Sequence, residues 1–161
     1  MKNANAVARL TRFVPRESFP FAEVDLTEAY AAHAKKALRG VALVGNRRAV
    51  LVQDEFEIET PCEVLWGMTT DAEIDIKSPG VARLTLGGKK LLARVLSPSD
   101  ASFTVESAEQ KPPQKSNQGV SRLLVRLPKT EGNITIAVLL SPEWEDGASV
   151  RKVSIKPLAE W

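Results

Sequence analysis

Asp54 is a carboxylate placed on the apolar side of a strand-like stretch, and its position raises the question of chemistry. Residues 50–59, VLVQDEFEIE, alternate as a half-buried strand does, with one apolar face and one mainly acidic face. The acidic face consists of Gln53, Glu55, Glu57 and Glu59. A carboxylate on the apolar face can be a catalytic group, a metal ligand or half of a structural ion pair.

A structural partner for Asp54 follows from the pairing of two adjacent strand-like runs. If they form a hairpin whose turn centres on Asn46-Arg47, apolar residues face apolar residues along both strands. The same register places Arg39 opposite Asp54. Proteins tolerate a buried carboxylate when a guanidinium pairs with it. We therefore interpret Arg39 and Asp54 as a structural ion pair, in preference to a catalytic assignment.

Tyr30 and His33 are the only tyrosine and the only histidine, and they lie three residues apart in the stretch TEAYAAHAKKA, residues 27–37. That stretch is typical of a helix, on which the two side chains could share a face. Tyrosine and histidine together can abstract a proton next to a carboxylate and protonate a leaving group. A surface or helix-packing pair is the simpler explanation, and no third group lies near them in the sequence. We assign no catalytic residue.

Metal and cofactor sites have no support in the sequence. One histidine and one cysteine, far apart, give none of the ligand spacings of metal sites. The glycine-rich motifs of nucleotide binding and the nucleophile motif of serine hydrolases do not occur. We expect neither a metal nor a cofactor, and we interpret Cys62 as a small buried thiol.

Binding residues are sought among the tryptophans and the basic pairs. Trp66 alternates with apolar neighbours, which favours the core, whereas Trp144 lies in the loop sequence SPEWEDG and could stack on a sugar ring. Lys89 and Lys90 follow a Gly-Gly pair that is typical of a two-residue hairpin loop. As candidates for substrate binding we name Trp144, Lys89 and Lys90, with solvated hairpin lysines as the simpler explanation for the last two.

The elements that would position these residues are mostly strands. The chain has 161 residues, 43% of them hydrophobic, which suits one domain with its own core over residues 1–161. Short apolar or alternating runs recur between turn signals, a pattern that predicts an all-β antiparallel sandwich with one short helix at 27–37. The predicted strand runs are Ala6–Val14, Phe21–Leu26, Leu38–Val44, Val50–Ile58, Glu63–Met68, Val81–Leu86, Leu91–Leu96, Ser102–Val105, Ser121–Leu127, Ile134–Leu140 and Ser149–Ile155.

Turns and charge complete this organisation. Turn signals include Ser78-Pro79-Gly80, Gly87-Gly88 and Gly132-Asn133. Residues 108–119, AEQKPPQKSNQG, predict an exposed, mobile loop. The net charge of +2 permits an acidic partner without requiring one. Residues 1–13 lack the apolar stretch of a signal peptide, and no run is long enough to span a bilayer.

Several stretches, read in order, resemble the β-sandwich part of heparinase II/III-like polysaccharide lyases. The resemblance extends from about Ala6 to Pro142 and depends on the order of motifs that are individually weak. The stretches are Asp25-Leu26-Thr27-Glu28-Ala29-Tyr30, Arg39, Ala49-Val50-Leu51-Val52-Gln53-Asp54-Glu55, Leu65-Trp66-Gly67-Met68-Thr69-Thr70, Gly88-Lys89-Lys90-Leu91-Leu92-Ala93, Val95-Leu96-Ser97-Pro98 and Val138-Leu139-Leu140-Ser141-Pro142.

The resemblance implies a function for a longer parent protein. In that family an α-helical toroid precedes the sandwich, the substrate lies between them, and uronic-acid polysaccharides such as glycosaminoglycans are cut by β-elimination. The catalytic Tyr, His and Asn or Glu come mainly from the toroid, and a His-Asn strand opens the sandwich. This sequence matches neither, and it has Thr69 where relatives often have histidine. We therefore expect a lyase fragment that is inactive alone, from a periplasmic or secreted parent.

Three functional hypotheses remain. The first is a non-catalytic sandwich domain that forms one wall of the substrate cleft, supports the missing toroid and self-associates through the face the toroid would cover. The second is a stand-alone carbohydrate-binding or interaction module that uses Trp144 and the lysine pairs. The third is an enzyme that uses Tyr30 and His33.

Overall fold

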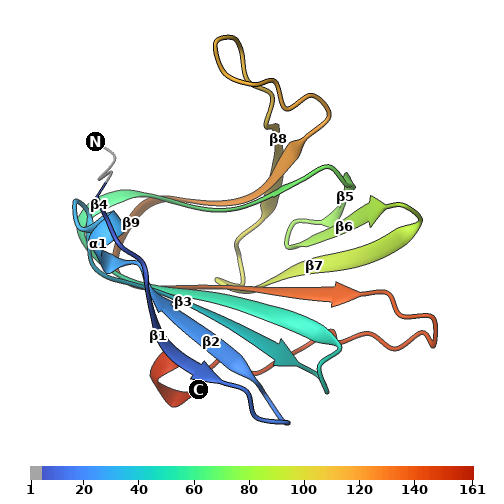
Figure 1. Cartoon of the computed structure of the whole chain (residues 1–161), viewed down its shortest axis with the longest axis horizontal. Helices are drawn as coiled ribbons and strands as arrows, with labels where there is room; N and C mark the ends of the chain where they lie inside the picture. Colours follow the sequence, from blue (N-terminus) through green and yellow to red (C-terminus); the bar gives the residue numbers. More distant parts are fainter. Residues whose placement is uncertain (1–4) are drawn as a thin grey trace.

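The computed structural model describes residues 5–161, so residues 1–4, at the start of the stretch inspected for a signal sequence, lie outside the described residues. The described chain is all-β, with antiparallel pairing throughout (Figure 1). The sheet order is β1-β2-β3-β4-β9-β7-β6-β5, and β8 pairs with β9. The elements are β1 (Arg9–Val14), β2 (Phe21–Asp25), α1 (Thr27–Tyr30), β3 (Ala34–Val44), β4 (Ala49–Thr70), β5 (Glu73–Ser78), β6 (Val81–Leu86), β7 (Lys89–Ser97), β8 (Phe103–Ser107), β9 (Ser121–Pro142) and the 3₁₀ turn η1 (Leu158–Glu160).

The two longest strands build both layers of the sandwich. β4 and β9 pair from Val50 opposite Leu140 to Thr70 opposite Ser121, with irregular register between Ile58 and Val64. At the matching point of β9, Gly132 has φ +76°, a conformation that glycine adopts without a steric penalty. The two strands bend together there and fold the sheet over itself (Figure 1). The predicted sandwich is confirmed. The sequence predicted two separate strands within each of the ranges 49–70 and 121–142, whereas in the structure each range is one continuous strand that runs through both layers.

The main core fills the space between the layers. The upper layer consists of the C-terminal half of β4, the N-terminal half of β9 and β8, and the lower layer contains the other halves of β4 and β9 with their neighbouring strands. The upper layer contributes four buried side chains to the core: Trp66, Phe103, Leu123 and Val125. From the lower layer come small and branched residues of β6, β7 and β9, including Ala82, Leu84, Ala93, Ile136 and Val138. Alanines opposite a tryptophan let the layers pack closely, because interiors fill to crystal-like density. We call the side of the lower layer that faces this core the inner face.

The hairpin of β3 and β4 has the predicted register. Leu43 pairs with Val50, and Arg39 pairs with Asp54. The loop between the strands has positive φ at Gly45, Asn46 and Arg47, as a tight turn at this position requires. The Gly87-Gly88 hairpin is confirmed as well, since Leu86 pairs with Lys89 and both glycines have positive φ.

The C-terminal segment, residues 143–161, covers the outer face of the lower layer. It contains no strand, so the predicted strand Ser149–Ile155 is wrong. Val150, Val153, Ile155 and Trp161 instead pack against a second core of β2, β3, β4 and β9. This cover buries Gln53 completely and leaves Glu55 only partly exposed. The C-terminal segment therefore covers the Gln53 end of the mainly acidic side, whereas Glu59 at its other end is exposed.

Two local predictions fail because tertiary packing overrides intrinsic preference. The helix ends at Tyr30, and Ala34 and Ala37 are buried in β3, since alanine's preference for helix is weaker than sheet pairing and burial. The predicted turn at Gly132-Asn133 is a bend inside β9. Strand β5, which the sequence did not predict, pairs with β6 at the edge of the sheet.

Residues 109–119 are exposed and form neither helix nor strand, whereas Ala108, the first residue of the predicted loop, is buried; the mobility of the loop stays a prediction. Among the described residues, no helix is long and apolar enough to cross a bilayer.

Candidate functional site

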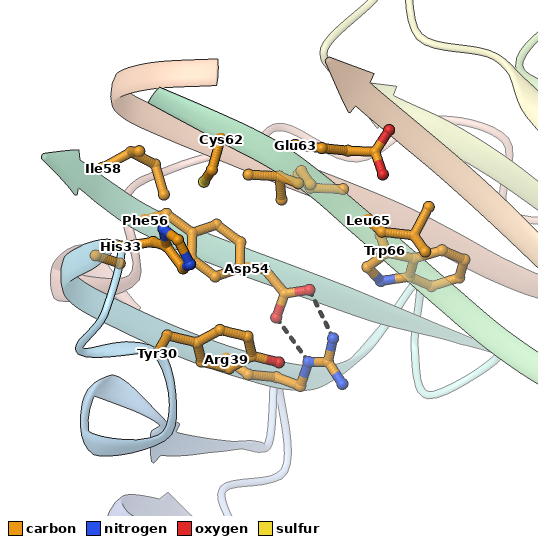
Figure 2. A pocket seen from close by; sticks show the side chains of 13 residues that line it. Tyr30, His33, Arg39, Asp54, Phe56, Ile58, Cys62, Glu63, Leu65 and Trp66 are labelled. Carbon is orange, nitrogen blue, oxygen red and sulfur yellow. Dashed lines mark hydrogen bonds and ion pairs between the residues drawn. The ribbon is translucent and has the colours of Figure 1, made fainter. Parts of the chain in front are cut away.

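The strongest candidate site is a cavity of about 440 Å³ on the inner face, which we call the inner cavity. It lies between the β3–β4 hairpin and the part of β4 that continues into the upper layer (Figure 2). Its lining residues are Tyr30, His33, Ala34, Arg39, Asp54, Phe56, Ile58, Cys62, Glu63, Val64, Leu65, Trp66 and Ile136.

Arg39 and Asp54 form the charged part of this lining. Arg39 Nε donates to Asp54 Oδ1 at 2.6 Å, and Arg39 Nη2 donates to Asp54 Oδ2 at 2.8 Å (Figure 2). Asp54 is 2% exposed, whereas the Arg39 side chain keeps 41% of its surface in contact with solvent. The hydrogen bonds to Asp54 raise the pKa of the Arg39 guanidinium, and burial opposes them only in part. The two-pronged contact is the strong geometry for this pair of groups.

The same pairing weakens a catalytic assignment at this position. Both oxygens of Asp54 already accept a hydrogen bond from Arg39, so the carboxylate is engaged within the fold. We retain the structural ion pair as our interpretation of Arg39 and Asp54.

Tyr30 and His33 both line the inner cavity, although the helix predicted to hold them ends at Tyr30 (Figure 2). The Tyr30 ring packs edge-on against Phe56, with 6.0 Å between ring centroids. Half of the Tyr30 side chain is exposed. The structure thus brings together the two residues that sequence spacing singled out, next to a carboxylate that is already paired.

Cys62 and Glu63 complete one side of the inner cavity. Cys62 is partly exposed, so the interpretation of a buried thiol is wrong: the bend of β4 places it at the cavity wall. Glu63 is turned toward Arg126, whose Nη1 donates to Glu63 Oε1 at 2.6 Å. Within residues 5–161, no three His, Cys, Asp or Glu side chains gather as a metal site requires.

Trp66 is the residue of the cavity that sequence reasoning missed. It is 5% exposed and packs near Phe103, as its alternation with apolar neighbours predicts. Its indole Nε1 is buried and finds no hydrogen-bond partner among the described residues. Buried tryptophans usually place this group against an acceptor. Nothing in the local sequence signals the missing partner, because the acceptor would have come from a distant strand.

The predicted binding residues Trp144, Lys89 and Lys90 lie together in a second depression, of about 580 Å³, which we call the Trp144 hollow. Its other lining residues are Arg48, Pro142, Glu143, Glu145 and Asp146. Trp144 is 41% exposed, but its Nε1 donates to the Arg48 carbonyl at 2.9 Å and the Arg48 guanidinium covers the ring at 5.3 Å.

The charges of the Trp144 hollow nearly cancel. Three cationic side chains face three acidic ones, and Arg48 pairs with Asp146. A backbone hydrogen bond from Ala148, followed by the bond from Arg48, lowers the pKa of Asp146 and keeps it ionised. The hollow therefore offers an aromatic surface and mobile lysines without a strong positive potential.

No family model matches the sequence, and no curated protein matches it. Among solved structures, heparan sulfate lyase HepC from Pedobacter heparinus superposes on 86% of this chain with a TM-score of 0.66 and 18% identity. The heparinase III BT4657 gene product superposes on 84% with a TM-score of 0.64 and 13% identity, and another heparinase III on 84% with 0.64 and 8%.

These likenesses concern the fold of part of each enzyme. The chain covers 22% of HepC and 21% of each of the other two proteins. At such low identity the comparison establishes shared architecture and leaves the activity open. The resemblance predicted from the sequence is therefore confirmed at the level of fold: the chain has the architecture of a segment of heparinase III lyases.

Proposed function

We propose that this chain is a non-catalytic β-sandwich domain of a heparinase-like polysaccharide lyase whose parent cleaves uronic-acid polysaccharides by β-elimination. The observation that carries the proposal is the superposition of 86% of the chain on HepC. The domain forms one wall of the substrate cleft and supports an α-helical toroid. The parent is periplasmic or secreted.

The apolar edge of the sheet supports a role beside another domain. Val7, Leu10 and Phe13, on and next to strand β1, are each more than half exposed. β1 ends the sheet order in the described part of the chain, so one side of its backbone lacks a neighbouring strand. Exposed apolar edges are typical of surfaces that another domain or chain covers. Self-association of the isolated chain through this edge is an expected consequence.

The proposal is tested by the reading frame and by activity. DNA upstream of the Met1 codon should encode, in frame, a helical domain of several hundred residues. The isolated chain should release no unsaturated uronides from heparin, heparan sulfate or alginate, measured by their ultraviolet absorbance, whereas the joined protein should. Activity of the isolated chain, abolished by His33→Ala, would replace this proposal with an enzyme that uses Tyr30 and His33.

A stand-alone carbohydrate-binding module is the second candidate, and the grouping of Trp144, Lys89 and Lys90 in one hollow favours it. Trp144→Ala should then weaken binding to heparin or alginate, and added salt should weaken it steeply because exposed charges are screened. Trp161→Phe, at the opposite covered face, is the matched control. Equal binding by Trp144→Ala and the unmodified chain would eliminate this candidate.

A further inference from the structure

The three tryptophans differ in what their indole N–H groups bind. Trp144 donates to the Arg48 carbonyl at 2.9 Å and Trp161 donates to the Lys156 carbonyl at 3.2 Å. Trp66 Nε1 has no acceptor among residues 5–161, although it is buried. A buried donor without an acceptor costs free energy that a hydrogen bond would recover. The unpaired donor is thus the one that belongs to the inner cavity.

The polar groups nearest to Trp66 in the cavity offer both donors and acceptors. Figure 2 shows the indole nitrogen on the side of the Trp66 ring toward Asp54 and Arg39. Arg39 uses Nε and Nη2 in its bonds to Asp54, which leaves Nη1 to donate elsewhere. Each Asp54 oxygen that accepts from Arg39 has a further lone pair. An occupant can therefore accept from Trp66 and Arg39 and donate to Asp54.

The charge of the lining selects an uncharged occupant. The positive charge of Arg39 is matched by Asp54, and Glu63 is matched by Arg126 outside the cavity. An anion or a cation would lose its hydration without gaining an unmatched partner. Tyr30 and His33 add a hydroxyl and an imidazole to the lining, and most of the remaining wall, such as Phe56, Ile58 and Ile136, is apolar. Apolar walls with a few polar groups at one side suit a ring with hydroxyl groups on its edge.

We propose that the inner cavity binds one uncharged, hydroxyl-bearing ring of about the size of a single sugar unit, with one oxygen accepting from Trp66 Nε1 and one hydroxyl bonding to the Arg39–Asp54 pair. The cavity volume of about 440 Å³ lies within the range of small-molecule sites, about 300–1,000 Å³. Trp66 Nε1 is covered, so binding in this way requires the ring to turn slightly toward the cavity. This site goes beyond the proposed acidic-polysaccharide cleft and does not depend on it.

The indole signals of the three tryptophans test the proposal in the unmodified chain. In ¹H–¹⁵N spectra, methyl glucopyranoside, methyl galactopyranoside or N-acetylglucosamine at up to tens of millimolar should shift the Trp66 indole signal, with little change at Trp144 and Trp161. Assignment comes from Trp144→Phe and Trp161→Phe. No shift at Trp66 with any of these ligands would overturn the proposal, since the unpaired donor would then have no function in binding such rings.

A charged ligand of similar shape tests whether the inner cavity selects uncharged rings. Methyl glucuronide differs from methyl glucoside by a carboxylate in place of a hydroxymethyl group. It should bind the inner cavity about tenfold more weakly or worse, because the guanidinium in the lining, Arg39, is already matched by Asp54. Equal or tighter binding of the glucuronide at Trp66 would overturn the uncharged class and would point to the acidic substrate of the proposed lyase. The two proposals therefore fail separately.

Cys62 supplies an independent measurement because it is the only cysteine and lines the inner cavity. A bound ring should slow alkylation of Cys62 by iodoacetamide, with half-protection at the concentration that half-shifts the Trp66 signal. Trp66→Phe, which keeps an aromatic ring and removes the donor, should weaken binding about 3- to 10-fold, whereas Trp144→Phe should not. Unchanged affinity in a folded Trp66→Phe variant would remove Trp66 from the site. If that variant does not fold, the Cys62 and Trp66 measurements on the unmodified chain decide.

Discussion

Two neighbouring cross-strand pairs of β3 and β4, which we call the inner rung and the outer rung, bury polar groups in different ways. On the inner face, Arg39 and Asp54 pair between Val24 and Ile136; on the outer face, Gly40 and Gln53 pair between Glu23 and Ala137. Both rungs bury polar groups. The inner rung satisfies its carboxylate with an arginine of the next strand and leaves a cavity above it.

The end of the chain supplies partners for most polar groups of the outer rung, although Gln53 Oε1 is buried without a partner among the described residues. Gln53 Nε2 donates to the Lys156 carbonyl at 2.8 Å, and Leu158 N–H donates to Glu55 Oε1 at 2.6 Å. Arg12 joins Glu23 to the carbonyls of Leu158 and Trp161. The difference teaches that burial alone does not distinguish a binding face from a closed one. What distinguishes them is the cover: the C-terminal segment lies on the outer rung, whereas a cavity remains beside the inner one.

The largest effect should come from removing the cation of the inner rung. Arg39→Met leaves Asp54 buried without a partner and should lower the free energy of unfolding by about 3–5 kcal/mol. Asp54→Asn should cost less, about 1–2 kcal/mol, because the exposed Arg39 side chain can turn to water. Urea unfolding of both variants measures the asymmetry. Equal costs would mean that Asp54 is not held as a buried charge.

The second largest effect should come from substituting Gly40 in the outer rung, because Leu158 and Trp161 occupy the space that a side chain there would need. A methyl group at Gly40 would meet Leu158 and lie 2.8 Å from Trp161 Cζ3. Gly40→Ala should therefore displace the C-terminal segment and cost about 1–3 kcal/mol. Hydrogen exchange at the Leu158 amide should accelerate at the same time. An unchanged exchange rate would show that residues 143–161 do not rest on Gly40. Gly80→Ala is the control for general loss of glycine, because its φ is not positive and an added Cβ would come no closer than 3.5 Å to its neighbours.

Acid should weaken the outer rung through Glu23. Burial opposes ionisation of Glu23, but hydrogen bonds from Arg12 and Thr11 outweigh it and lower the pKa of this carboxyl below its ordinary value of 4.5. The stability that this contact supplies is complete above pH 4.5 and is lost as the pH falls through the folded pKa. Urea midpoints between neutral and acidic pH should fall less steeply for Glu23→Gln. Parallel curves would contradict a role for Glu23 in acid sensitivity.

The smallest effect should come from a pair exposed on the same hairpin. Lys35 Nζ lies 3.3 Å from Glu57 Oε1, and the two side chains are 63% and 43% exposed. Lys35→Met should change stability by less than about 0.5 kcal/mol. This variant is the surface reference for Arg39→Met, measured under the same urea conditions. A loss comparable to that of Arg39→Met would show that the hairpin tolerates no change of charge at all.

Sequence reasoning succeeded where neighbours in the chain decide the outcome. The pairing of Arg39 with Asp54 followed from a short hairpin, in which turn position fixes register. The all-β class followed from recurring alternation. The grouping of Trp144 with Lys89 and Lys90 was not derivable from spacing, although each residue was singled out.

Sequence reasoning failed where segments that are distant in the chain come into contact. Residues 27–37 read as helix because alanine favours it, but Ala34 and Ala37 are buried in a sheet that residues 49–58 complete. The cover over Gln53 comes from residues 156–158, about a hundred positions later. The unpaired indole of Trp66 is likewise a property of the assembled layers.

The continuity of β4 and β9 has a consequence for how the domain loses its structure. Each strand belongs to the lower layer at one end and to the upper layer at the other, without an intervening loop. Peeling the upper layer away would pull on the backbone that pairs with β3 and β7. Melting should therefore be a single cooperative transition, seen alike by tryptophan fluorescence and by far-ultraviolet circular dichroism.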